Sequence, residues 1–228
     1  DLSEPTGPRL VATALPGRYA RQVVRFGDRL AVLTGNAAID VLEIADPANP
    51  EHLGTVRLQH FGRQIADRLL RGRYVVVGNG LGVRIIDLEA EGGPALSFAH
   101  DTREKLSFGA NGVALIGDML LVTGYHQLRA FDLSDPSSLE PLSEAQVGVA
   151  PVRLTLGETV DGVTRAWAAS PTIGGVVVAD VHADGRVEVI AELATPGHAS
   201  RVVLAEDRAL LADGYAGVHA LPVDTMQR

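Results

Sequence analysis

The sequence has no cysteine, a single lysine and few aromatic residues, and each shortage narrows what the chain can do. Without cysteine, disulfides, thiolate metal sites and catalysis through sulfur are excluded. Aromatic residues make up 4% of the 228 residues whereas hydrophobic residues make up 46%. Val, Leu, Ile and Ala must therefore fill the core, and these are the side chains that suit packed β-sheets.

The sequence also lacks an excess of positive charge and any long apolar run. Its net charge is −8, which argues against general binding of nucleic acid, because a phosphate-binding surface needs a basic excess. No run approaches 18 apolar residues, so we expect no membrane span. Apart from Lys105 the positive charge is all arginine, and a local arginine cluster can still hold an anion in bidentate fashion.

What the chain does have is a repeat. An acidic residue ends an apolar run at Glu43, Asp87, Asp132 and Asp180, at intervals of 44, 45 and 48 residues, and Pro222 takes this position in a fifth copy. We expect these acids to be structural, bonding to the turns that follow them. A repeat of this length indicates one array of similar units rather than several unrelated domains.

Each unit contains four short apolar segments separated by turn residues. A first strand is followed by a tight turn, then by a continuously apolar second strand, a Gly-rich hairpin, a third strand that ends in the acid, and a fourth strand. Four strands per unit of this length are typical of a β-propeller blade. The sequence therefore predicts an all-β fold, a five-bladed propeller of four-stranded antiparallel blades.

The two ends of the chain predict how the ring closes. Residues 1–17 resemble residues 132–148, which form the end of a unit, although no strand precedes them. The fifth unit stops after its third strand, near residue 223. We therefore expect the N-terminal strand, RLVATAL at 9–15, to complete the C-terminal blade, so that residues 1–228 form a single propeller domain without an open sheet edge. Because the chain begins at Asp1, we also expect it to be a processed or excised part of a larger chain or assembly.

The repeat resembles the LVIVD-repeat family of bacterial and archaeal propellers. The resemblance is carried by VLEIADPANPEHLGTV at 41–56, IIDLEAEGGPAL at 85–96 and FDLSDPSSLEPL at 131–142, and it extends over nearly the whole chain. The fourth unit departs from the pattern at 183–185, as the fifth does at Pro222. The resemblance implies a propeller fold and an extracellular or cell-surface location, and it implies no particular reaction, because sites are grafted onto folds.

The segments that lead into the first strands carry the candidate binding residues. In four of the five units an aromatic or imidazole ring is followed shortly by Arg or Asn, and these segments should meet at one end of the central channel. Guanidinium and ring groups together favour an anionic ligand with a flat or apolar body. The structural alternative is that these arginines pair with acids of neighbouring blades. The predicted ligand-binding residues are Tyr19, Arg21, Phe61, Arg63, Phe108, Asn111, Arg153, Arg201 and Tyr215.

An enzyme acting at the same place is the competing hypothesis. His126 or His198 with Asp213 would supply acid–base chemistry, and Tyr125 would donate a proton. A lyase, isomerase or cyclase, or hydrolase would fit these groups, whereas no G-x-S-x-G segment supports a serine nucleophile.

Metal and cofactor sites are weaker hypotheses. Some histidines fall on segments assigned to this end of the channel, but no HxH or HExxH spacing is present and nearby arginines would repel a cation. We therefore predict neither a metal nor a cofactor. The histidines concerned are His60, His100, His126 and His198.

One insertion and the choice of partner remain open. The insertion from His100 to Gly109 is longer than its counterparts, and it is either a lid over the channel or a solvated connector. The first reading is a binding module for an anionic small molecule or a protein partner, and the third possibility is a structural spacer within a surface assembly.

Overall fold

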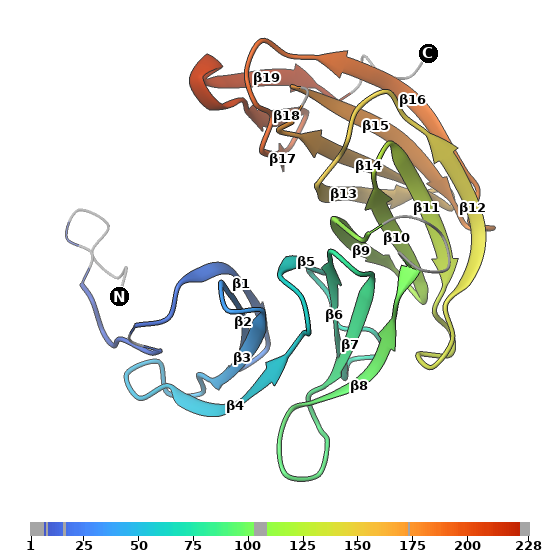
Figure 1. Ribbon diagram of the computed structural model, residues 1–228. Helices are drawn as coiled ribbons and strands as arrows, with labels where there is room; N and C mark the ends of the chain where they lie inside the picture. Colours follow the sequence, from blue (N-terminus) through green and yellow to red (C-terminus); the bar gives the residue numbers. More distant parts are fainter. Residues whose placement is uncertain (1–6, 8, 16, 103–108, 173, 224–228) are drawn as a thin grey trace.

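A computed structural model describes residues 7, 9–15, 17–102, 109–172 and 174–223. They form five antiparallel sheets, four with four strands and one with three (Figure 1). The first two sheets contain β1 (Ala20–Phe26), β2 (Arg29–Thr34), β3 (Ala38–Glu43) and β4 (Glu51–Arg57), then β5 (Gly62–Ile65), β6 (Tyr74–Asn79), β7 (Val83–Asp87) and β8 (Ala95–His100). The third and fourth contain β9 (Gly112–Ile116), β10 (Met119–Gly124), β11 (Gln127–Asp132) and β12 (Glu140–Gln146), then β13 (Arg153–Val160), β14 (Val163–Ser170), β15 (Gly175–His182) and β16 (Val187–Ala194). The fifth contains β17 (Arg201–Ala205), β18 (Arg208–Ala212) and β19 (Val218–Pro222), with a 3-10 helix at Gly214–Ala216.

Each sheet is a simple meander in which every strand pairs with the next strand in the chain. In the first four sheets the second strands are mostly buried on both faces, as their continuous apolar sequences predict, and β6 is an example with Val75, Val76 and Val77 all fully buried. The second strand of the fifth sheet, β18, is buried only at alternate residues. The all-β prediction and the strand order within the units are confirmed. No helix in the described residues is long and apolar enough to cross a membrane.

The core lies between consecutive sheets. Ile39 of the first sheet packs in one cluster with Val77 of the second, and Ile85 of the second packs in another with Phe131 of the third. Similar clusters join the third sheet to the fourth and the fourth to the fifth, where the fully buried ring of Trp167 is the largest side chain. Sheets that pack face to face around an arc in this way form a multi-bladed, β-propeller-like fold.

The acids that mark the repeat have structural partners. Asp87 accepts hydrogen bonds from Arg73 and from the backbone N–H of Glu89 at 2.8 Å, and the bond from Arg73 holds the pKa of Asp87 below its ordinary value. Asp132 accepts from the backbone N–H of Ser134 at 2.7 Å. The prediction that these acids bond to the following turns is confirmed for Asp87 and Asp132.

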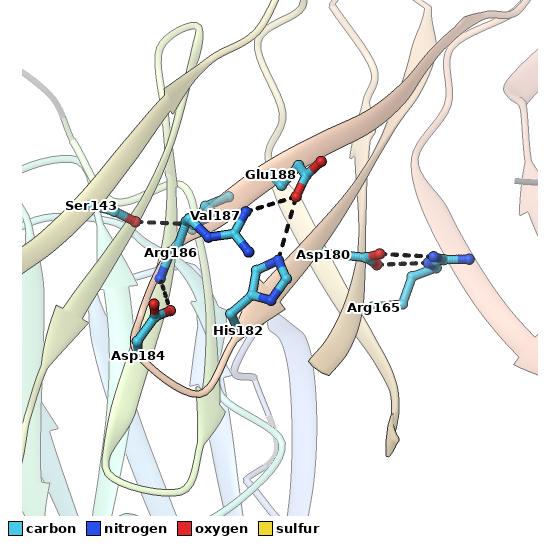
Figure 2. A network of polar contacts seen from close by, with 8 residues as sticks. All are labelled: Ser143, Arg165, Asp180, His182, Asp184, Arg186, Val187 and Glu188. Carbon is cyan, nitrogen blue, oxygen red and sulfur yellow. Dashed lines mark hydrogen bonds and ion pairs between the residues drawn. The ribbon is translucent and has the colours of Figure 1, made fainter. Parts of the chain in front are cut away.

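In the fourth sheet the equivalent acid bonds to an arginine of the adjacent strand. Arg165 donates to both carboxylate oxygens of Asp180, at 2.8 and 2.9 Å, and this bidentate pair appears in Figure 2. The same view shows Ser143, on the outer strand of the third sheet, accepting from the backbone N–H of Val187 in the fourth at 3.2 Å. Polar contacts therefore fix strand register within a sheet and also join neighbouring sheets.

The sheets form an open arc and not a closed ring. The first and fifth sheets stand apart on the left side of Figure 1, and in the described residues β19 pairs only with β18. Residues 9–15 contain no strand, and a turn with Leu15 at φ 54° and a hydrogen bond from Arg18 N–H to Leu15 O lies between this segment and β1. The closing strand predicted from the sequence is therefore not formed in this structure, and the fifth sheet has three strands instead of four.

Candidate functional site

The innermost strands of the sheets surround a central cavity of about 820 Å³. A volume of this size is within the range of small-molecule sites. The lining comes mainly from β1, β5, β13 and β17, while β9 contributes Ala114. The polar and charged lining residues are Arg21, Gln22, Arg25, Gln64, Asp67, Arg153, Thr155, Ser200 and Arg201.

One register position recurs in all five innermost strands, and a β-bulge decides which residue occupies it. In β1 and β5 the register shifts between Ala20 and Gln22 and between Gly62 and Gln64, so that the glutamines, and not Arg21 and Arg63, face the second strand there. Arg153 and Arg201 occupy this position in β13 and β17, whereas Arg21 and Arg63 lie one residue before it in β1 and β5. The equivalent residues are Gln22, Gln64, Gly112, Arg153 and Arg201, paired with Leu33, Gly78, Thr123, Ala169 and Ala212.

The two glutamines at this position connect sheets. Gln22 Nε2 donates to the carbonyl of Ile65 at 3.1 Å, and Gln22 Oε1 accepts from the N–H of Ile65 at 2.9 Å. Gln64 makes the same pair of bonds with the backbone of Leu154, both at 3.0 Å. The first sheet is thus joined to the second, and the second to the fourth.

Gly112 makes the second of these connections possible. The glutamine of β5 bypasses the third sheet, because a Cβ at Gly112 would lie 3.1 Å from Gln64 Oε1 and 3.2 Å from the carbonyl of Val152. Farther round the arc, Thr155 Oγ1 donates to the carbonyl of Val202 at 2.8 Å and joins the fourth sheet to the fifth. The sequence signal for the glutamines is the Arg-Gln pair that recurs at 21–22 and 63–64, of which only the arginines were predicted to have a role.

Three guanidinium groups face this cavity without acidic partners. Arg21, Arg153 and Arg201 all line it, and none of them belongs to an ion pair between described residues. Burial, followed by repulsion from Arg201 and then from Arg21, lowers the pKa of Arg153. The part of the cavity that these three arginines line is therefore an uncompensated positive site on a chain whose net charge is −8.

One acidic residue also lines the cavity. Asp67 lies three residues after Gln64, beyond the end of β5, and it is exposed. Arg25 lies 3.8 Å from Asp28 in an exposed ion pair. Asp67 and Arg25 thus add one charge of each sign to the lining, in addition to the three arginines.

The predicted aromatic residues do not line the cavity with the arginines. Tyr19, Phe61 and Tyr215 are exposed at the surface, and Tyr19 packs over Gly35 while Phe61 meets His60 edge to face. Arg63 is exposed and also lies outside the lining. Asn111 is half-buried, with its N–H bonded to the carbonyl of Thr123. Phe108, with residues 103–107 of the predicted lid, lies outside the described residues.

The residues proposed for acid–base chemistry have other partners. Asp213 is fully buried and accepts hydrogen bonds from Thr195 Oγ1 at 2.6 Å, Gly197 N–H at 3.0 Å and His219 Nε2 at 3.1 Å. Burial acts to raise the pKa of Asp213, but these bonds outweigh it and the pKa is lowered. Its imidazole partner is His219 instead of the predicted His126 or His198.

The two predicted imidazoles bond to carbonyl groups. His198 Nδ1 lies 2.6 Å from Pro171 O, and His126 Nδ1 lies 3.3 Å from Val147 O, with the Tyr125 ring packed edge-on against His126. His126 lies in the loop between β10 and β11 and His198 in the loop between β16 and β17, and no hydrogen bond joins the two imidazoles among the described residues. Nor does any group of three or more His, Asp or Glu side chains in the described segments have the arrangement of a metal site.

The fold and this cavity define a β-propeller-like protein with an arginine-rich central channel. Comparison with known proteins supports the fold alone. No family model matches the sequence, and no curated protein matches it.

Solved structures match the fold at low sequence identity. A protein from Lactobacillus plantarum has a TM-score of 0.61 and 16% identity over 79% of this chain and 56% of that one. BBS1N in complex with ARL6DN, in a mercury-soaked crystal, has a TM-score of 0.65 and 14% identity over 94% of this chain and 67% of that one. The lead-soaked crystal of the same complex gives 0.65 and 11% over 93% and 64%. This chain thus spans between about half and two thirds of the length of the structures it matches.

Proposed function

We propose that this chain is a β-propeller binding module that takes an anionic ligand at Arg21, Arg153 and Arg201. The observation that carries the proposal is the convergence of these guanidinium groups in one cavity of about 820 Å³ without acidic partners. Like charges held close together cost free energy, and a bound carboxylate or phosphate offsets that cost through charge-assisted hydrogen bonds.

The test compares two arginines that differ in where they point. Isothermal titration with phosphate, sulfate and citrate at constant ionic strength should show binding to the native chain and about tenfold or greater loss for Arg153→Gln, since charge-assisted bonds contribute about 1.5–3 kcal/mol each. Arg63→Gln is the matched control, because Arg63 is exposed on an equivalent innermost strand but lies outside the cavity lining. Equal loss in both variants, or no binding by the native chain, would refute the proposal.

A protein partner is the second candidate, and exposed aromatic residues favour it. Tyr19, Phe61, Tyr125 and Tyr215 are 77%, 53%, 69% and 102% exposed, and all lie on segments that enter first strands or join second to third strands. Those segments share one end of the blades, and Tyr and Phe are enriched in protein interfaces. The similarity to BBS1N, solved in complex with ARL6DN, adds support at the level of fold.

This second function is tested by pull-down with the surface altered. Tyr19→Ser together with Tyr215→Ser should abolish capture of the partner and leave anion binding unchanged, while Val160→Ser, an exposed apolar control on β13 with 62% exposure, should leave capture intact. Retained capture in the double variant would refute a role for these rings.

Acid–base catalysis by Tyr125, His126, His198 and Asp213 is the remaining alternative. If an anionic substrate is turned over and the turnover survives His198→Gln, the result would argue against catalysis by these residues.

We further propose that residues 1–228 form one five-bladed domain of the LVIVD-repeat type, extracellular or at the cell surface. Its ring would close when residues 9–14 pair with β19 as the fourth strand of the fifth blade. An apolar groove of about 390 Å³ lies beside β19 and is lined by residues 193–196, 211 and 218–221. Residues 9–14 would bind in this groove as the fourth strand. Leu10 and Val11 are 81% and 39% exposed and supply apolar side chains for it.

Ring closure is open to a direct test because the chain has no native cysteine. Val11→Cys with Ala220→Cys should form a disulfide under mild oxidation, since paired strands bring Cα atoms within the 4.4–6.8 Å that a disulfide needs. Val11→Cys with Val160→Cys is the control pair, and no crosslink is expected. Absence of a crosslink in the first pair would contradict closure by this strand.

A further inference from the structure

The hydrogen bonds that join the sheets stop at the gap between the fifth sheet and the first. Gln22 joins the first sheet to the second, Gln64 joins the second to the fourth, and Thr155 joins the fourth to the fifth. Among the described residues no hydrogen bond or ion pair runs from the fifth sheet to the first. The arc therefore lacks one connection to become a ring.

The arginine cluster spans this unconnected gap. Arg21 belongs to the first sheet, Arg153 to the fourth and Arg201 to the fifth, and repulsion from Arg21 and Arg201 contributes to the lowered pKa of Arg153. Like charges on facing sheets repel, and this repulsion opposes approach of the first sheet to the fifth. The repulsion among the three arginines that line the cavity must therefore be offset before the two sheets can approach each other.

We propose that the ligand of this cavity is a multivalent anion that bridges Arg21 to Arg153 and Arg201 and thereby draws the first sheet toward the fifth. This inference rests on the proposed anion binding. A single carboxylate accepts one guanidinium in bidentate fashion, so a monovalent anion leaves the other arginines uncompensated. Three guanidinium groups from three sheets call for two or three acidic groups on one molecule, as in a tricarboxylate or a pyrophosphate.

Apolar surface beside the arginines fits the same closure. Val23 of β1 and Val203 of β17 both line the cavity, and they are 54% and 49% exposed. Each lies next to the arginines of its own sheet, on the two strands that flank the gap. Movement of one sheet toward the other would cover both side chains and add a favourable apolar contribution to the binding of the anion.

The experiment measures binding and sheet separation independently. Spin labels at Glu51→Cys and Asp207→Cys report the distance between the first and fifth sheets, and both positions are exposed. The control pair is Glu51→Cys with Glu91→Cys, because the first and second sheets are already joined by Gln22. Binding is followed by calorimetry with citrate, pyrophosphate and acetate at equal ionic strength.

Citrate or pyrophosphate should shorten and narrow the distance distribution of the Glu51→Cys/Asp207→Cys pair and leave that of the control pair unchanged. Acetate should change neither distribution. Arg21→Gln should abolish the shortening and weaken citrate about tenfold, and Arg21→Lys should restore part of the shortening, because it restores the charge. Citrate binding without a change in distance overturns this inference and leaves the proposed function intact. Acetate acting as well as citrate also overturns it, and absence of binding by every anion overturns both.

Discussion

The side-chain amide of Gln64, in the second sheet, makes two hydrogen bonds of 3.0 Å to the backbone of Leu154, in the fourth sheet. The third sheet lies between them in the chain order, and the absence of a side chain at Gly112 provides the passage. One glutamine therefore fixes the relative position of two sheets that are not neighbours in sequence.

Loss of the two hydrogen bonds between Gln64 and Leu154 should destabilise the chain. Gln64→Ala leaves the backbone N–H and C=O of Leu154 buried without partners, and we expect the free energy of unfolding to fall by about 2–4 kcal/mol. Urea unfolding followed by circular dichroism measures this fall. Gln146→Ala, at an exposed position of β12, is the control and should change it by less than about 0.5 kcal/mol. Similar values for the two variants would contradict the role of Gln64.

Gly112 should not tolerate even a methyl group. In Gly112→Ala the new Cβ would lie 2.7 Å from Thr123 Oγ1 and 3.1 Å from Gln64 Oε1, so we expect a loss of about 1–3 kcal/mol from overpacking. Gly157→Ala on β13 is the matched control, because its Cβ would meet neighbours only at 3.4 Å or more. The midpoint of thermal unfolding should be lower for Gly112→Ala than for Gly157→Ala. Equal midpoints would show that a methyl group fits at Gly112 beside Thr123 and Gln64.

Stability should fall in acid through the acids that mark the repeat. The pKa of Asp87 is lowered below its ordinary value of 3.8, mainly by the hydrogen bond from Arg73. A carboxyl whose pKa is lower in the folded state contributes stability above the unfolded pKa and loses it as pH falls through the folded pKa. The free energy of unfolding should therefore decrease below about pH 4, and Asp87→Asn should reduce that slope. Urea titrations between pH 2.5 and pH 6 provide the measurement, and an unchanged slope in the variant would count against this assignment.

Removing a channel arginine should stabilise the chain when no anion is present. Burial and repulsion both lower the pKa of Arg153, so its charged form is disfavoured in the folded state. At low salt, Arg153→Gln should raise the unfolding midpoint and increase the free energy of unfolding by about 0.5–1 kcal/mol. Added salt should reduce this difference between the variant and the native chain. If the midpoint falls instead, Arg153 has a stabilising partner and the cavity is not an uncompensated positive site.

Local patterns account for the elements that were predicted correctly. The apolar runs, the turn residues between them and the acids at Asp87 and Asp132 depend on neighbours a few residues away, and the structure forms the expected strands and turn bonds there. The segment at 9–15 has the pattern of a strand but forms none in this structure. Its pairing depends on a sheet edge some 200 residues away in sequence, and no local pattern specifies whether that edge is reached.

The candidate site divides in the same way. The sequence predicted that arginines would gather at one end of the channel, because they lie on the segments that lead into first strands. Arg21, Arg153 and Arg201 line the cavity. The position of Arg63 outside the lining and the exposure of Tyr19 did not follow from the sequence. Nor did the β-bulges in β1 and β5, since a bulge of one residue leaves the sequence pattern almost unchanged.

The sequence by itself determined that this chain folds into repeated units of short antiparallel strands, with structural acids at the ends of third strands such as Asp87 and Asp132, because apolar runs and turn chemistry act over short distances. The tertiary structure alone decided which side chains share the channel and how Gln64 reaches Leu154. Those relationships depend on the angle and spacing between packed sheets, which arise from contacts between residues far apart in the chain.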